Sequence, residues 1–102
     1  MTPEKVLEVV GVYREFFESR DVSKTKLTEE RFDELLFVSI VEDEESILEH
    51  CHQMLDFMEE FVRDNRMEKC FRWLGFIQGV LWSTGNFSLN ELKNHSRPND
   101  EK

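Results

Sequence analysis

A chain of 102 residues, of which 39% are hydrophobic and 34% charged, can form one compact domain, which we expect to span residues 1–98. Its net charge of −9 excludes the broad basic surface that direct binding of nucleic acid requires. Nine Phe and two Trp exclude a disordered chain, because disordered segments are poor in aromatic residues. The sequence shows no apolar leader and no apolar run of about 20 residues, so we expect a cytoplasmic protein with reduced cysteines.

The N-terminal part of the sequence predicts two helices. The first spans residues 3–19, since Thr2 is a typical N-cap, Pro3 suits the first helical position, and apolar residues then recur at helical spacing. After a polar connection, Thr28 is expected to cap a second helix. The β-branched run at residues 37–41 has no strand to pair with, so we interpret it as the end of that helix.

An acidic segment at residues 42–45 follows the second helix. It is either a short junction in which Asp43 caps a third helix or an acidic turn within one long helix, and the sequence leaves both readings open. A clear apolar face then continues to about Arg63. The link at residues 64–65 is short, which favours an antiparallel pairing of the third and fourth helices.

The C-terminal part predicts a fourth helix at residues 66–84, which Gly85 ends by adopting a left-handed conformation. Residues 88–91 have the pattern of a capping box for a short helix at residues 89–95. Residues 99–102 are expected to be a frayed tail. The predicted fold is therefore all-α, a small bundle of four helices with a short C-terminal helix.

The predicted fourth helix is apolar almost all the way round. It should therefore be the central helix or lie at a subunit interface. Gly75 and Gly79 are four residues apart and share one face, where the backbone of another helix could approach closely. We expect a helix-packing face or a homodimer interface here. Its residues are Trp73, Gly75, Phe76, Gly79 and Trp82.

Acidic residues are concentrated in the middle of the chain. Residues 26–64 hold 13 acidic and 3 basic residues, whereas residues 65–102 hold 4 acidic and 6 basic ones. A region of this kind is either a solvated face that keeps the protein soluble or a surface that attracts a basic partner. The candidate interaction residues are Glu29, Glu30, Asp33, Glu34, Glu42, Asp43, Glu44 and Glu45.

Two carboxylate pairs raise the alternative of an enzyme. Glu42-x-x-Glu45 matches the ExxE element with which all-α nucleotide pyrophosphohydrolases hold magnesium. The second element of those enzymes is missing in form, because Asp56-x-x-Glu59 reverses the residue types. No basic cluster is placed to neutralise substrate phosphates. We therefore keep this hydrolase as the alternative and favour a protein without catalysis.

The histidine and cysteine residues offer no stronger site. His50, Cys51 and His52 are adjacent, and adjacent residues on a helix diverge by about 100°, so they cannot converge on one ion. Cys70 follows a lysine, which would lower the pKa of an exposed thiol, but its apolar neighbours favour burial. We expect no metal, no cofactor and no catalytic residue.

The string MEKCFRWLGFIQG at residues 67–79, followed by Leu81-Trp82, Gly85 and ELKNHSRP at residues 91–98, resembles a small uncharacterised family of tailed-bacteriophage proteins. The resemblance covers about residues 50–98. It implies a phage origin and the host cytoplasm as the setting, and it supplies no catalytic residues.

The sequence thus predicts a small acidic module for protein–protein interaction. We expect it to bind a host or phage protein with a basic surface, and to inhibit or redirect a nucleic-acid-binding host protein if the acidic surface is used. A homodimer through the fourth helix is expected as well. Besides the hydrolase, a purely structural homodimer remains an alternative.

Overall fold

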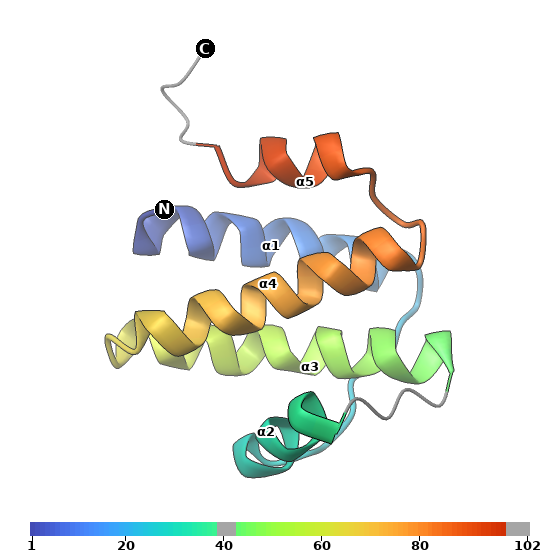
Figure 1. Cartoon of the computed structure of the whole chain (residues 1–102), viewed down its shortest axis with the longest axis horizontal. Helices are drawn as coiled ribbons and strands as arrows, with labels where there is room; N and C mark the ends of the chain where they lie inside the picture. The colour runs from blue at the N-terminus through green and yellow to red at the C-terminus, as the bar shows by residue number, and fades with distance from the viewer. Residues whose placement is uncertain (39–42, 98–102) are drawn as a thin grey trace.

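Five helices and no strand make up the part of the chain that the computed structural model describes, residues 1–38 and 43–97 (Figure 1). The helices are α1 (Pro3–Ser19), α2 (Glu29–Val38), α3 (Glu44–Arg63), α4 (Met67–Ser83) and α5 (Leu89–His95). The predicted all-α bundle with a short C-terminal helix is confirmed. The predicted extension of the second helix to residue 41 and the predicted frayed tail lie outside the described residues.

Side-chain caps start the helices where the sequence predicts. Oγ1 of Thr2 accepts a hydrogen bond from the backbone N–H of Lys5, and Ser88 and Glu91 form a complete capping box at α5. Asp43 has an extended backbone and accepts from the N–H of Ser46, so α3 begins as a helix of its own. Of the two readings left open for the acidic segment, the junction capped by Asp43 is the one observed.

Within the described residues, three helices are followed by a left-handed residue. Asp21, Asn65 and Gly85 follow α1, α3 and α4 with φ of 55°, 58° and 75°. After α3, the N–H of Arg66 bonds to the carbonyl of Phe61 at 2.7 Å, the long closing bond that typically ends a helix in this way. This tight reversal folds α4 back against α3, and the predicted left-handed role of Gly85 is confirmed.

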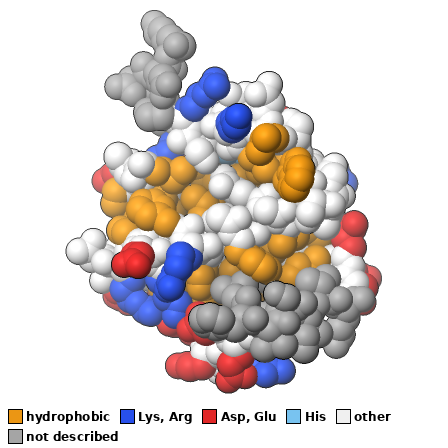
Figure 2. All heavy atoms as spheres, viewed as in Figure 1, with side chains coloured by type: hydrophobic (Ala, Val, Ile, Leu, Met, Phe, Trp, Pro, Cys, Tyr) orange, Lys and Arg blue, Asp and Glu red, His pale blue; other side chains and the backbone are white. Residues whose placement is uncertain are grey.

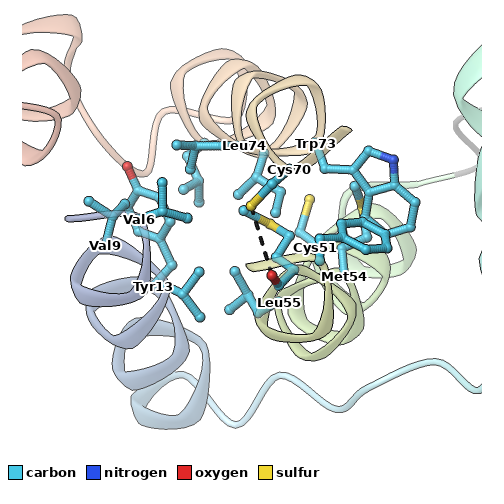
Figure 3. Packing of buried hydrophobic residues seen from close by; sticks show 14 of the residues in the cluster. Val6, Val9, Tyr13, Cys51, Met54, Leu55, Cys70, Trp73 and Leu74 are labelled. Atoms are coloured by element: carbon cyan, nitrogen blue, oxygen red, sulfur yellow. Dashed lines mark hydrogen bonds between the residues drawn. The ribbon is translucent and has the colours of Figure 1, made fainter. Parts of the chain in front are cut away.

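Helices α1, α3 and α4 enclose the core. Figure 3 shows their side chains pointing toward one another, with Val6 and Tyr13 from α1, Leu55 from α3 and Leu74 from α4. Each large apolar side chain that is fully buried contributes about 1.5–3 kcal/mol of transfer free energy. The buried residues that these helices contribute to the hydrophobic core cluster are Val6, Val9, Val10, Tyr13, Phe17, Cys51, Met54, Leu55, Met58, Phe61, Cys70, Trp73, Leu74, Ile77 and Leu81.

Helix α2 lies at the lower edge of the molecule in Figure 1 and is attached through an aromatic cluster. Phe32 is buried, and its ring centroid lies 5.6 Å from that of Trp73 and 5.9 Å from that of Phe57. Phe61 meets Trp73 from another side at 4.9 Å. These contacts are edge-to-face, the arrangement that aromatic quadrupoles favour.

A chain of hydrogen bonds holds α5 on the opposite edge. The side-chain amide of Gln78 donates to the hydroxyl of Tyr13 and to Oγ of Ser96, both at 3.1 Å. The Tyr13 hydroxyl also shares a hydrogen bond with Nδ1 of His95, 3.1 Å away. Leu92 adds the buried apolar contact of α5.

The connection between α1 and α2 is held by two neighbouring side chains of α3. Nδ1 of His52 donates to the carbonyl of Val22 at 2.8 Å. Oε1 of Gln53 accepts from the N–H of Leu27 and the hydroxyl of Thr25, and its amide donates to the Leu27 carbonyl. In the described ranges, no helix is both long and apolar enough to cross a membrane.

Candidate functional site

Glu29 and Asp33, two of the predicted interaction residues, serve to fasten α2 to α4. The guanidinium of Arg66 donates two hydrogen bonds to the Glu29 carboxylate, at 2.8 Å from Nη2 to Oε2 and 3.2 Å from Nη1 to Oε1. Nζ of Lys69 lies 2.6 Å from Oε2 of Glu29 and 2.7 Å from Oδ2 of Asp33. Hydrogen bonds from Arg66 and then from Lys69 lower the pKa of Glu29 to about 2. These two carboxylates are therefore occupied within the chain.

The other predicted acidic residues that the structure describes are exposed. Glu30, Glu44 and Glu45 are exposed, Glu34 pairs with Arg31 on its own helix, and Asp43 caps α3 while remaining exposed. Glu42 lies outside the described residues. We call Glu30, Glu34, Asp43, Glu44 and Glu45 the acidic edge. In Figure 2, acidic side chains gather along the lower border of the molecule, where α2 lies, and are sparse over α4 and α5.

The predicted fourth-helix residues divide between the core and the surface. Trp73 is only 1% exposed and belongs to the core, and Phe76 is half-buried against it. Gly75 and Gly79 face open space, since a Cβ atom built on either would meet nothing within 4 Å. Trp82 is 57% exposed. Thus no described part of the same chain makes the close approach expected at the two glycines.

Sequence reasoning missed a groove beside these glycines, between α4 and α5. Its volume is about 440 Å³, and its walls are mostly apolar. Figure 2 shows hydrophobic side chains on this face, with Lys and Arg side chains above them on α5. The lining residues are Gln78, Gly79, Trp82, Leu89, Leu92, Lys93, Ser96 and Arg97. The only signal in the sequence was that Trp82 and Leu89 are apolar. Helical spacing alone could have assigned both side chains to the core.

The second carboxylate pair of the alternative enzyme, Asp56 and Glu59, is held by cations of other segments. Nη2 of Arg14 lies 2.8 Å from Asp56 and 2.7 Å from Glu59, and Nζ of Lys24 lies 3.0 Å from Asp56. Glu45 stands exposed in the first turn of α3, and its expected partner Glu42 is outside the described residues. Among the residues that the structure describes, no group of three His, Cys, Asp or Glu side chains is placed to hold a metal ion.

Both cysteines are buried in the core and lack the features of a nucleophile. Burial raises the pKa of Cys70 to about 11 and raises the pKa of Cys51 further from its ordinary value. Sγ of Cys70 is directed at the carbonyl of Met58, 3.8 Å away (Figure 3). His52 is buried too, and its ring lies 5.3 Å from that of Phe17. A thiol kept neutral in this way neither attacks a substrate nor binds a metal at neutral pH.

No protein-family model, no curated protein and no solved structure significantly matches this chain. The fold and the distribution of side chains define the class: a small all-α protein with an exposed acidic edge at α2 and α3 and an apolar groove with basic flanks at α4 and α5.

Proposed function

We propose that this protein is an acidic protein–protein interaction module that binds a partner with a basic surface through its acidic edge. The observation that carries the proposal is the division of the carboxylates into two groups. Glu29, Asp33 and Asp56 are engaged by cations of the same chain, whereas Glu30, Glu44 and Glu45 are directed to solvent. The second group is available to a partner without breaking any contact that stabilises the fold.

The charge of the chain favours one kind of partner. A net charge of −9 repels nucleic acid and acidic proteins and accelerates encounters with basic ones. Proteins that bind nucleic acid present basic surfaces of this kind, so a module with an acidic edge could compete with nucleic acid for such a surface. The resemblance of residues 50–98 to tailed-bacteriophage proteins favours a host protein as that partner, with inhibition or redirection as the outcome.

Capture from bacterial lysate at low and high salt tests the proposal. The immobilised protein should retain a basic protein at low salt and release it as salt screens the charges. The variant in which Glu30, Glu34, Glu44 and Glu45 are changed to Gln should lose that protein. A bound protein that resists salt, or that the edge variant retains, would contradict the proposal.

A matched variant controls for net charge. Glu4, Glu15, Glu18 and Glu60 are exposed elsewhere on α1 and α3, so changing them to Gln removes the same charge from other surfaces. This variant should still capture the basic protein if the location of the acidic residues, rather than the net charge, determines binding. Turnover of nucleoside triphosphates with magnesium, measured on the same preparations, would instead establish the hydrolase alternative.

A further inference from the structure

Phe71 and Trp82 form a pair of exposed aromatic side chains on one face of α4. Phe71 is 40% exposed and Trp82 is 57% exposed. They are eleven positions apart, which is about three helical turns, so they point in nearly the same direction about 16 Å apart. Gly75 and Gly79 lie between them on that face and leave the backbone uncovered. The groove opens beside Trp82, at one end of this row.

The Phe71 ring projects at one end of α4 and the groove lies at the other end. Such a face can be complementary to the same face of a second copy. We propose that the α4–α5 face binds a second copy of this chain, with the two α4 helices antiparallel and crossing between Gly75 and Gly79. In that arrangement, the Phe71 side chain of each copy enters the groove of the other and packs on Trp82. The interface is isologous and closes with two copies.

Charge supports a second copy as the occupant. Two chains of net charge −9 repel each other least where acidic residues are fewest, and residues 65–102 hold 6 basic and only 4 acidic residues. Lys93 and Arg97 flank the groove, and Glu68 is exposed one turn before Phe71. An antiparallel copy brings Glu68 with Phe71 toward the end of α4 that these two cations flank, so charges of opposite sign meet.

This proposal is independent of the proposed function, because the acidic edge and the α4–α5 face share no residue. A dimer would present two acidic edges to a partner. Capture by the acidic edge can therefore fail while dimerisation succeeds, and the reverse can also occur.

Sedimentation equilibrium over a concentration series tests for the dimer, with Phe71→Ser as the disrupting variant. The wild type should fit a monomer–dimer equilibrium, and Phe71→Ser should raise the dissociation constant at least about tenfold, as loss of a buried aromatic anchor typically does. Leu7 on α1 is 41% exposed, so Leu7→Ser is a matched control that should leave the dissociation constant unchanged. A wild type that stays monomeric to its solubility limit, or equal effects of both variants, would overturn the proposal.

Thiol cross-linking tests the antiparallel arrangement. Arg72 and Ser83 are exposed on this side of α4, and both native cysteines are buried. A short thiol-to-thiol cross-linker should join Arg72→Cys to Ser83→Cys when the two variants are mixed, and should join neither variant efficiently to itself. Efficient self-joining of each variant, with none in the mixture beyond it, would indicate parallel helices and overturn the proposal. Both variants leave Phe71 and Trp82 in place.

Discussion

Tyr13 of α1 and His95 of α5 share a hydrogen bond of 3.1 Å although 82 positions separate them in the chain. The Tyr13 oxygen also accepts from Gln78, and a neutral His95 ring with Nδ1 unprotonated can accept the Tyr13 proton. Burial accordingly lowers the pKa of His95 from its ordinary value. Its partly buried position in the contact between α5 and the bundle therefore favours the neutral imidazole.

Acid should loosen α5. Because the pKa of His95 is lower in the folded state, the unfolded state binds more protons below about pH 6.5, and stability falls as pH drops through that value. Hydrogen exchange at the α5 amides, corrected for intrinsic rates, should therefore rise between about pH 7.5 and 5.5. His95→Gln removes the titrating group and should flatten this dependence; an unchanged profile would assign the effect to another group.

The ion pair between Glu29 and Arg66 should make stability depend on pH in a lower range. The pKa of Glu29 is about 2 in the folded protein and near its usual value in the unfolded chain. The contribution of Glu29 to the free energy of unfolding is therefore complete above the usual pKa of a glutamate. It is lost as the pH falls toward 2. Glu29→Gln should cost about 1 kcal/mol at neutral pH, a modest value because the pair is partly solvated.

Denaturant titration of Glu29→Gln and Glu30→Gln from neutral to acidic pH checks this. Glu30 is adjacent and exposed, so its replacement should leave the free energy of unfolding within about 0.5 kcal/mol of wild type. The difference between the two variants should shrink as the pH approaches 2. A constant difference would mean that Glu29 acts through something other than its charge.

Replacing Phe32 and Phe71 by Ala should distinguish a core position from a surface position by the change in the free energy of unfolding. Phe32→Ala removes a ring that is 1% exposed between Trp73 and Phe57 and should lower the free energy of unfolding by about 3 kcal/mol or more. Phe71→Ala removes a ring that is 40% exposed and should cost the monomer less than about 0.5 kcal/mol. Chemical denaturation at a low protein concentration measures both, and similar costs would refute this account of how α2 is attached.

Neither thiol should react in the folded protein. Cys51 and Cys70 are buried and their pKa values are raised, so thiolate is scarce and inaccessible. A chromogenic disulfide reagent should show no reaction in native buffer and two thiols in denaturant. Ser19→Cys, at an exposed position, should react at once and serves as the control. Rapid modification of either native cysteine would show that the core opens readily.

Local signals in the sequence account for most of the fold. Thr2, Asp43 and Ser88 each carry an oxygen that can satisfy a free N–H group, and Gly85 adopts a positive φ at little cost, so helix ends are encoded by single residues. The apolar period then identifies the buried face of each helix. Both kinds of signal act within a few residues and are visible in the sequence alone.

The surfaces were less predictable because they depend on contacts between distant residues. Glu29 and Glu30 are identical neighbours in the sequence, yet only Glu29 meets Arg66 once α2 has docked. Trp73 and Trp82 likewise share a helix and a residue type, but only Trp73 is covered by α2 and α3. The direction from which other helices approach decides such cases, and no local pattern reports it.

The hydrogen bonds from the His52 and Gln53 side chains should protect the connection between α1 and α2 from proteases. A protease must draw several residues of extended backbone into its cleft, and here the carbonyls of Val22 and Leu27 are already held by α3. Cleavage of this connection should therefore wait until α3 releases it. The first nicks in limited digestion should fall elsewhere, and the persistence of an intact fragment across residues 20–28 would report how long α3 stays folded.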